Sequence, residues 1–200
     1  MTSNLVEKGY DRVAAVYNTN RHSGTCRDGL EDFASRLSEN ANVLDAGCGT
    51  GYASRFLDQR GFSVTGIDIS NRMLDFARKK VPGATFLKMD MKDMDLRGDL
   101  FDGIVSLYAI IHVDRKFHRE ILSKFYEGLK PSGFLLLLTG WGDYVGTEDD
   151  YLVKGTRMSW SYFDRDVNLR MIKQSGFRII WTKRDKKGKG VHLLVLARKM

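Results

Sequence analysis

Three glycines at alternate positions, Gly47, Gly49 and Gly51, follow a short apolar run that begins at Val43. The apolar run predicts a buried β-strand, and the spacing of apolar residues after Gly51 predicts a helix. Glycine permits a tight turn and lets a ligand approach the backbone, because no Cβ is in the way. A strand, a glycine loop and a helix in this order indicate the ligand-binding start of an α/β sheet.

Strand-like and helix-like segments alternate along the rest of the chain. Apolar runs predict strands at 43–47, 63–67, 85–89, 101–107 and 134–139, with helices between them. Two further β-rich runs, 177–182 and 191–197, flank a predicted hairpin loop over 183–190. This order predicts an α/β fold with a mostly parallel sheet, whose ligands bind beyond the carboxyl ends of the strands.

Acidic residues precede the glycine loop and end the next two predicted strands. The loop has the spacing Gly-x-Gly-x-Gly rather than the dinucleotide fingerprint Gly-x-Gly-x-x-Gly. Asp45 would repel a pyrophosphate and attract an ammonium or sulfonium group. Asp68 is placed to accept hydrogen bonds from two ribose hydroxyls, and Asp90 from an adenine amine. Each acid alone is typical of a solvated strand end, but the set describes S-adenosylmethionine.

Five stretches match the pattern of one family: VLDAGCGTG at 43–51, GIDIS at 66–70, MDM at 89–91, FDGIVSLYAIIHV at 101–113 and LKPSGFLLL at 129–137. With the closing hairpin at 177–199, the chain resembles the class I S-adenosylmethionine-dependent methyltransferases of the small, ubiquinone-biosynthesis-like type. The resemblance implies a Rossmann-like, doubly wound sheet of order 3-2-1-4-5-7-6 with strand 7 antiparallel. It implies one domain over 1–200, with a helical cap at 1–39 and the core at 40–200.

The resemblance also implies a set of contacts with S-adenosylmethionine. The expected contacts are Gly47 and Gly49 with the methionine part, Ser106 and Leu107 with the sulfonium, Asp68 with the ribose, and Ile69, Asp90 and Met91 with the adenine. Asp45, Gly51 and, from the N-terminal helix, Tyr17 complete the predicted cofactor site.

Methyl transfer from a sulfonium is an in-line displacement, which requires above all that donor and acceptor are held in line. A base is needed only when the acceptor has a proton that must leave. His112 is the predicted base and Tyr108 the second predicted catalytic residue, with core packing as the alternative for both. Further side chains expected near the mouth, or packed in the core, are Tyr10, Tyr17, His22, Trp141, Tyr144, Trp160, Tyr162 and Phe163.

The segment 106–109 reads Ser-Leu-Tyr-Ala. Nucleic-acid and protein amide methyltransferases of the family often have Asn/Asp-Pro-Pro-Tyr/Phe there, so a small-molecule acceptor is the leading prediction. The alternatives are a methyltransferase that acts on tRNA or another nucleic acid, and a cofactor-binding module without turnover. An NAD oxidoreductase is disfavoured by the loop spacing and by Asp45.

The net charge of +7 arises in one C-terminal element. Residues 178–200 contain eight of the 32 basic side chains and one of the 25 acidic ones, so the rest of the chain is neutral. Nucleic-acid binders usually spread positive charge along a face, which disfavours such a partner. The predicted hairpin loop would attract an anionic acceptor, unless its charges serve only solubility. Its charged residues are Lys183, Arg184, Lys186, Lys187 and Lys189, against Asp185 alone.

Composition and cysteine usage bear on the cellular compartment and on metal binding. No apolar run approaches the roughly 20 residues of a membrane span, and the N-terminus lacks the apolar core of a signal peptide. Cys26 and Cys48 cannot form a disulfide framework, so a reduced, cytoplasmic compartment is expected. No histidine pair has metal-ligand spacing, and no metal is predicted. The oligomeric state stays open.

Overall fold

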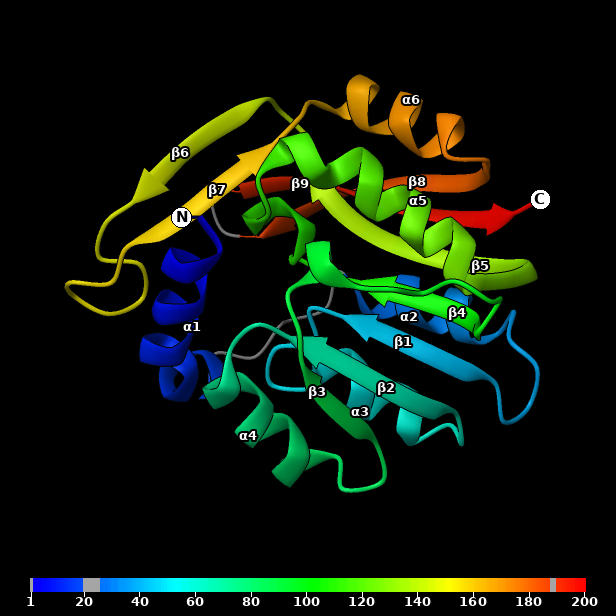
Figure 1. Cartoon of the computed structure of the whole chain (residues 1–200), viewed down its shortest axis with the longest axis horizontal. Helices are drawn as coiled ribbons and strands as arrows, with labels where there is room; N and C mark the ends of the chain where they lie inside the picture. The colour runs from blue at the N-terminus through cyan, green and yellow to red at the C-terminus, as the bar shows by residue number, and fades with distance from the viewer. Residues whose placement is uncertain (1, 20–25, 188–189) are drawn as a thin grey trace.

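The computed structural model describes residues 2–19, 26–187 and 190–200, and only the backbone of Thr2 and Lys187 (Figure 1). The predictions made for His22, Lys189 and the Lys187 side chain lie outside this description. Among the described helices, none is long and apolar enough to cross a membrane.

Strands and helices alternate through the centre of the chain, as predicted. The strands are β1 (Asn42–Ala46), β2 (Ser63–Asp68), β3 (Thr85–Lys88), β4 (Phe101–Ser106), β5 (Leu129–Gly140), β6 (Tyr144–Glu148), β7 (Met158–Tyr162), β8 (Phe177–Lys187) and β9 (Gly190–Lys199). The α-helices are α1 (Thr2–Thr19), α2 (Arg27–Ala34), α3 (Tyr52–Asp58), α4 (Asn71–Lys80), α5 (His118–Gly128) and α6 (Arg165–Gln174). Three short 3-10 helices are η1 (Met91–Asp93), η2 (Ile110–His112) and η3 (Arg115–Phe117).

A seven-stranded sheet of order β3-β2-β1-β4-β5-β9-β8 forms the centre of the molecule. The first five of these strands are parallel to their neighbours, and β9 is antiparallel to both β5 and β8. The predicted order, with an antiparallel last strand, is confirmed. Because β8 is parallel to β5, β8 ends at the same edge of the sheet as β1, β2 and β4.

Helices cover both faces of the sheet, and the side chains of β5 show how. Leu135 and Leu137 point to one face and belong to the core cluster with residues of α5 and α6. Leu136 and Leu138 point to the other face and pack with residues of α2 and α3. Since successive residues of a strand face opposite sides, a continuously apolar strand is the expected consequence of two helical layers.

A separate two-stranded sheet, β6 with β7, lies beside α1 (Figure 1). The sequence analysis missed it, because β6 is exposed along most of its length and no apolar alternation marks it. Gly9 lets α1 approach β7 closely: a Cβ there would lie 2.9 Å from Cε of Met158 and 3.0 Å from the carbonyl oxygen of Arg157. Together α1 and this sheet cover the carboxyl ends of the central strands.

The predicted loop over 183–190 was wrong in its extent. The charged run Lys183–Lys187 continues β8, and its backbone pairs with β9 as far as Gly190. A run of charges resembles a loop in sequence, but on an edge strand charged side chains can face solvent while the backbone stays paired. Asp185 is the exception in this run, since only 1% of its surface is exposed.

Candidate functional site

The glycine loop leaves β1 in a left-handed backbone conformation, with φ of 80° at Gly47, 52° at Gly49 and 80° at Gly51. The amides of Gly47 and Cys48 both donate to the carbonyl of Ile67, at 2.8 and 2.9 Å. A Cβ on Gly47 would lie 2.1 Å from Cβ of Ala109, so this position requires glycine for close packing as well as for its φ angle.

A cavity opens between this loop and the carboxyl ends of β1, β2 and β4, under α1. Most of the predicted cofactor and catalytic residues line it: Tyr17, Gly47, Gly49, Asp68, Ile69, Asp90, Met91, Leu107, Tyr108 and His112. Tyr10 lines it as well. None of the described residues in its lining is a lysine or an arginine. Its charge therefore suits a cationic ligand and disfavours a phosphate-bearing one.

Asp68 ends β2 at the floor of the cavity. Its Oδ2 accepts from the amide of Gly49 at 2.8 Å, and its Oδ1 from the amide of Ser70 at 2.9 Å. Burial raises the pKa of this carboxyl to about 6, although those two amides lower it. A carboxylate has about four acceptor positions, so each oxygen of Asp68 keeps capacity for one ligand hydroxyl.

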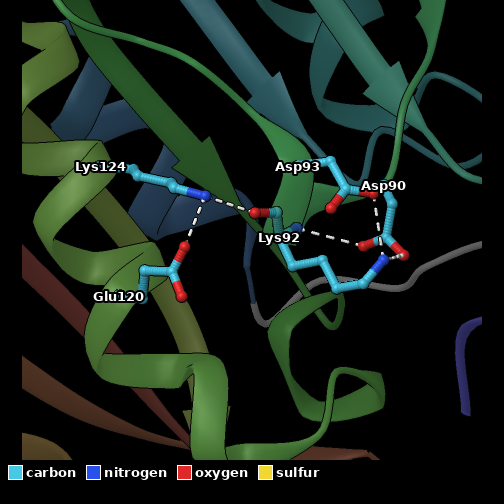
Figure 2. Close-up of polar contacts among 5 residues, drawn as sticks. All are labelled: Asp90, Lys92, Asp93, Glu120 and Lys124. Carbon is cyan, nitrogen blue, oxygen red and sulfur yellow. Dashed lines mark hydrogen bonds and ion pairs between the residues drawn. The ribbon is translucent and has the colours of Figure 1, made fainter.

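Asp90 follows β3 and forms the N-cap of η1, where it accepts from the amide of Lys92 at 3.1 Å. Figure 2 shows the Lys92 ammonium reaching back to the same carboxylate, 2.7 Å from Oδ2, and also to Asp93. Burial raises the pKa of Asp90, but these hydrogen bonds lower it on balance. Lys124 of α5, paired with Glu120, binds the Lys92 carbonyl and ties this turn to the helix (Figure 2).

Asp45, Gly51 and Ser106 do not line this cavity, in contrast to the prediction. Asp45 is 2% exposed and accepts from the amide and hydroxyl of Ser54, and burial raises its pKa to about 7. It lines a smaller adjoining pocket. Gly51 faces Ala77 of α4, and the buried Ser106 hydroxyl donates to the β1 backbone. These three residues build the loop and the sheet beneath the cavity.

His112 lies in η2, 5% exposed, with both ring nitrogens engaged. Nδ1 is 2.8 Å from the carbonyl oxygen of Ser159 on β7, so Nδ1 bears the hydrogen, because a carbonyl can only accept. Nε2 is therefore the free base, and it accepts from the Tyr10 hydroxyl at 2.7 Å. Burial lowers the pKa of His112 to about 4, so the imidazole is neutral at physiological pH.

Aromatic side chains from three segments surround this pair. Trp160 of β7 lies against the His112 ring with centroids 4.2 Å apart, and Tyr17 packs edge-on to Tyr10 at 5.7 Å. Tyr151, which the sequence analysis did not single out, contacts the rings of both Tyr10 and Trp160. Its segment between β6 and β7 has no periodic pattern that could have pointed to it.

The other predicted aromatic residues lie away from the cavity. Trp141 packs between Arg165 and Arg184, and Tyr144 is exposed on β6. Tyr162 and Phe163 pack against the main core cluster. Aromatic residues are common both in cavity walls and in the core, so residue type alone did not predict where these side chains lie.

Polar contacts hold α1 over the cavity. Asp11 accepts from the Ser70 hydroxyl at 2.6 Å and from the amide of Arg72 at 3.1 Å, beside the Asp68 carboxylate. Glu7 of the same helix pairs with Lys88 at 2.6 Å. The N-terminal helix thus contacts the ends of β2 and β3, and it brings Tyr10 and Tyr17 into the site.

The fold and the site together indicate the class of protein: a Rossmann-like sheet has, at its strand ends, a cavity lined by two acids and a neutral histidine. A methyltransferase-domain family model matches residues 43–133. The putative methyltransferase YqeM of Bacillus subtilis is 32% identical over 133 residues, 64% of this chain and 53% of that protein. The malonyl-[acyl-carrier protein] O-methyltransferase of Pectobacterium atrosepticum is 34% identical over 130 residues, 65% of this chain and 48% of that protein.

A solved structure has the same fold. The crystal structure of a SAM-dependent methyltransferase from Methanosarcina mazei matches with a TM-score of 0.75 at 21% identity, over 86% of this chain and 96% of that one. The chain spans about half the length of the curated relatives that it matches. The chain therefore matches a methyltransferase domain over residues 43–133 and has the fold of that S-adenosylmethionine-dependent methyltransferase.

Proposed function

We propose that the chain, as one domain over residues 1–200, transfers a methyl group from S-adenosylmethionine to a small molecule. The observation that supports this most is the cavity lining: two strand-end carboxylates, Asp68 and Asp90, and no described lysine or arginine. Such a lining fits a ribose, an adenine amine and a sulfonium, and it disfavours a dinucleotide with its pyrophosphate. A cytoplasmic location stays a prediction.

The glycine loop and the strand ends orient the cofactor in this proposal. Asp68 accepts from the ribose, Asp90 and Met91 face the adenine, and the loop with Gly47 and Gly49 contacts the methionine part. Leu107 and Tyr108 line the same cavity from the end of β4. When bound, S-adenosylmethionine supplies a methyl group activated by a positively charged sulfur.

The pair of His112 and Tyr10 suits an acceptor with a proton to lose. Nε2 of His112 is unprotonated and directed at the Tyr10 hydroxyl, 2.7 Å away. An acceptor O–H or N–H group that hydrogen-bonds the Tyr10 hydroxyl can pass its proton to that oxygen while the hydroxyl passes its own proton to Nε2. The Ser159 carbonyl fixes the ring in the required tautomer. The base then contributes about 10²–10⁴-fold to the rate.

We further propose that the acceptor has an anionic group away from its reacting atom. Arg184 and Lys186 are exposed near the end of β8, at the cavity edge of the sheet. The one acid of this stretch, Asp185, is buried and does not offset them at the surface. The Pectobacterium relative acts, by its name, on malonyl-[acyl-carrier protein]. Nucleic acid remains the alternative for this surface.

Calorimetry with S-adenosylhomocysteine, the demethylated product, tests the cofactor assignment. We expect binding by the wild-type chain and no binding of NAD. Labelled S-adenosylmethionine with a cell extract, followed by identification of the labelled product, then tests the transfer. Binding without any labelled product would favour the binding module, and absence of binding would refute the proposal. Label recovered in tRNA, with affinity that falls steeply as salt rises, would favour the nucleic-acid alternative.

A further inference from the structure

A buried carboxylate contacts Tyr108 and is not among the described residues that line the cavity. Asp185 of β8 is 1% exposed, and its Oδ2 accepts from the Tyr108 hydroxyl, 77 residues away in sequence. Its Oδ1 has no hydrogen-bond partner among the described residues. His192 of β9, directly across from Asp185 in the hairpin, has its Nδ1 4.0 Å from the same Oδ2. Burial of a carboxylate costs free energy unless the group is hydrogen-bonded or paired, so Asp185 depends on the Tyr108 hydroxyl.

Tyr108 itself has an unusual backbone. Its φ of 56° lies in the left-handed region, which a bulky residue avoids unless other contacts hold it there. Several of those contacts come from the last hairpin, and Cys26 Sγ also lies 3.8 Å from the Tyr108 hydroxyl. Asp185 holds the hydroxyl, and the His192 ring packs edge-on against the tyrosine ring with centroids 5.1 Å apart.

The turn that contains Tyr108 lies between the cofactor loop and the proposed base. The next residue, Ala109, is the one whose Cβ occupies the space beside Gly47. The carbonyl of Ala109 accepts from the amide of His112 at 3.0 Å and so begins η2. Leu107, Tyr108 and Ala109 all line the cavity. A shift of this turn would therefore move one wall of the cavity and the start of η2 together.

We propose that Asp185 is a positioning residue: through its hydrogen bond to Tyr108 it holds the 107–109 turn against Gly47 and so shapes the cofactor cavity. The proposed effect on the cofactor rests on the proposed function, whereas the effect on the turn does not. In sequence, Asp185 is a single acid within a basic run. In the fold, it links the last hairpin to the centre of the site.

Hydrogen exchange of the ligand-free protein tests the effect on the turn. We expect the amides of 109–113 to exchange about tenfold faster or more in Asp185→Ala than in the wild type, because a hydrogen bond to a charged group is lost. Tyr108→Phe removes the same hydrogen bond without altering Asp185, and it should give the same result. Val195→Ala, which truncates a buried side chain of β9, is the control: it lowers Tm and leaves the exchange of 109–113 unchanged.

Calorimetry with S-adenosylhomocysteine, well below the Tm of each variant, tests the effect on the cavity. Asp185→Ala and Tyr108→Phe should each weaken binding about tenfold, and the double variant no further, because both remove one hydrogen bond. Val195→Ala should bind like the wild type. Exchange and affinity in Tyr108→Phe equal to those of Val195→Ala would overturn the inference, whether or not Asp185→Ala folds. Failure of the wild type to bind would refute the proposed function, and the exchange result would still decide the role of Asp185.

Discussion

The cofactor half and the acceptor half of the site are built from contacts of very different range. In the cofactor half, Asp68 is held by the amides of Ser70 and Gly49, two and nineteen residues away. In the acceptor half, His112 is held by Ser159 and Tyr10, 47 and 102 residues away. Short-range contacts follow from a local motif, whereas the long-range ones require α1 and β7 to be in place first.

The two halves also differ in how burial changes their charge. Burial raises the pKa of Asp45 to about 7 and of Asp68 to about 6. Burial lowers the pKa of His112 to about 4. In both halves the neutral form is favoured, but the consequences for pH dependence have opposite signs. Variants of one half should therefore leave the properties of the other half intact, and the predictions below test that separation.

The largest effect is expected in the acceptor half. His112→Gln removes the proposed base, so kcat should fall about 10²-fold or more, while affinity for S-adenosylhomocysteine stays within about twofold, because no ribose or adenine contact is lost. Steady-state kinetics and calorimetry measure the two quantities. His118→Gln is the matched control, since His118 is also a buried histidine but is not among the described residues that line the cavity. Wild-type turnover in His112→Gln would exclude the histidine from the mechanism.

Asp68→Ala should change the cofactor affinity, in contrast to His112→Gln, which should change kcat. Loss of hydrogen bonds to a charged acceptor should weaken binding of S-adenosylhomocysteine by one to two orders of magnitude or about 1.5–3 kcal/mol. Asp166→Ala, which removes an exposed carboxylate on α6, should leave calorimetric affinity unchanged. Unaltered affinity in Asp68→Ala would contradict the ribose assignment.

The pH dependence of stability separates the halves without any ligand. The unfolded chain binds a proton at His112 near pH 6.5, but the folded protein does so only near pH 4. Stability is therefore lost as pH falls from 6.5 toward 4, by about 2 kcal/mol between pH 7.5 and pH 5. Asp45 and Asp68 act oppositely, since their raised pKa values lower stability as pH rises through their titration range. Urea titrations of the wild type and His112→Gln at both pH values isolate the histidine.

If the wild type is more stable than His112→Gln at pH 7.5, we expect the difference between their free energies of unfolding to be smaller at pH 5 by about 2 kcal/mol. A pH-independent difference would mean that His112 keeps an ordinary pKa. A base with an ordinary pKa would become protonated at a higher pH than one with a pKa of about 4, so the rate would begin to fall at a higher pH.

The smallest effect is expected at the basic hairpin. Replacing Arg184 and Lys186 with glutamine should raise the acceptor KM a few-fold, flatten the salt dependence of kcat/KM and leave cofactor affinity unchanged. Arg72 and Lys79 of α4, both exposed, give a control double variant with the same loss of charge elsewhere. Equal salt dependence in the two double variants would assign the hairpin charges to solubility alone.

Local sequence determined the cofactor half. The strand before Gly47, the three glycines and the strand-end acids Asp68 and Asp90 are each defined by a few neighbouring residues, because tight turns and strand ends depend on local backbone geometry. The alternation of strands and helices predicted a mostly parallel sheet, and the order of its seven strands was implied by the resemblance to the family.

Tertiary structure alone decided the acceptor half. Tyr10, Ser159 and Trp160 meet His112 only because α1 and the β6–β7 sheet pack over the ends of the central strands, and no local pattern encodes that packing. The same holds for Asp185. Its sequence neighbours are typical of a solvated loop, and only the extension of β8 places its side chain against Tyr108. Contacts between residues tens of positions apart depend on which faces become buried together, and the sequence of each segment specifies only its own face.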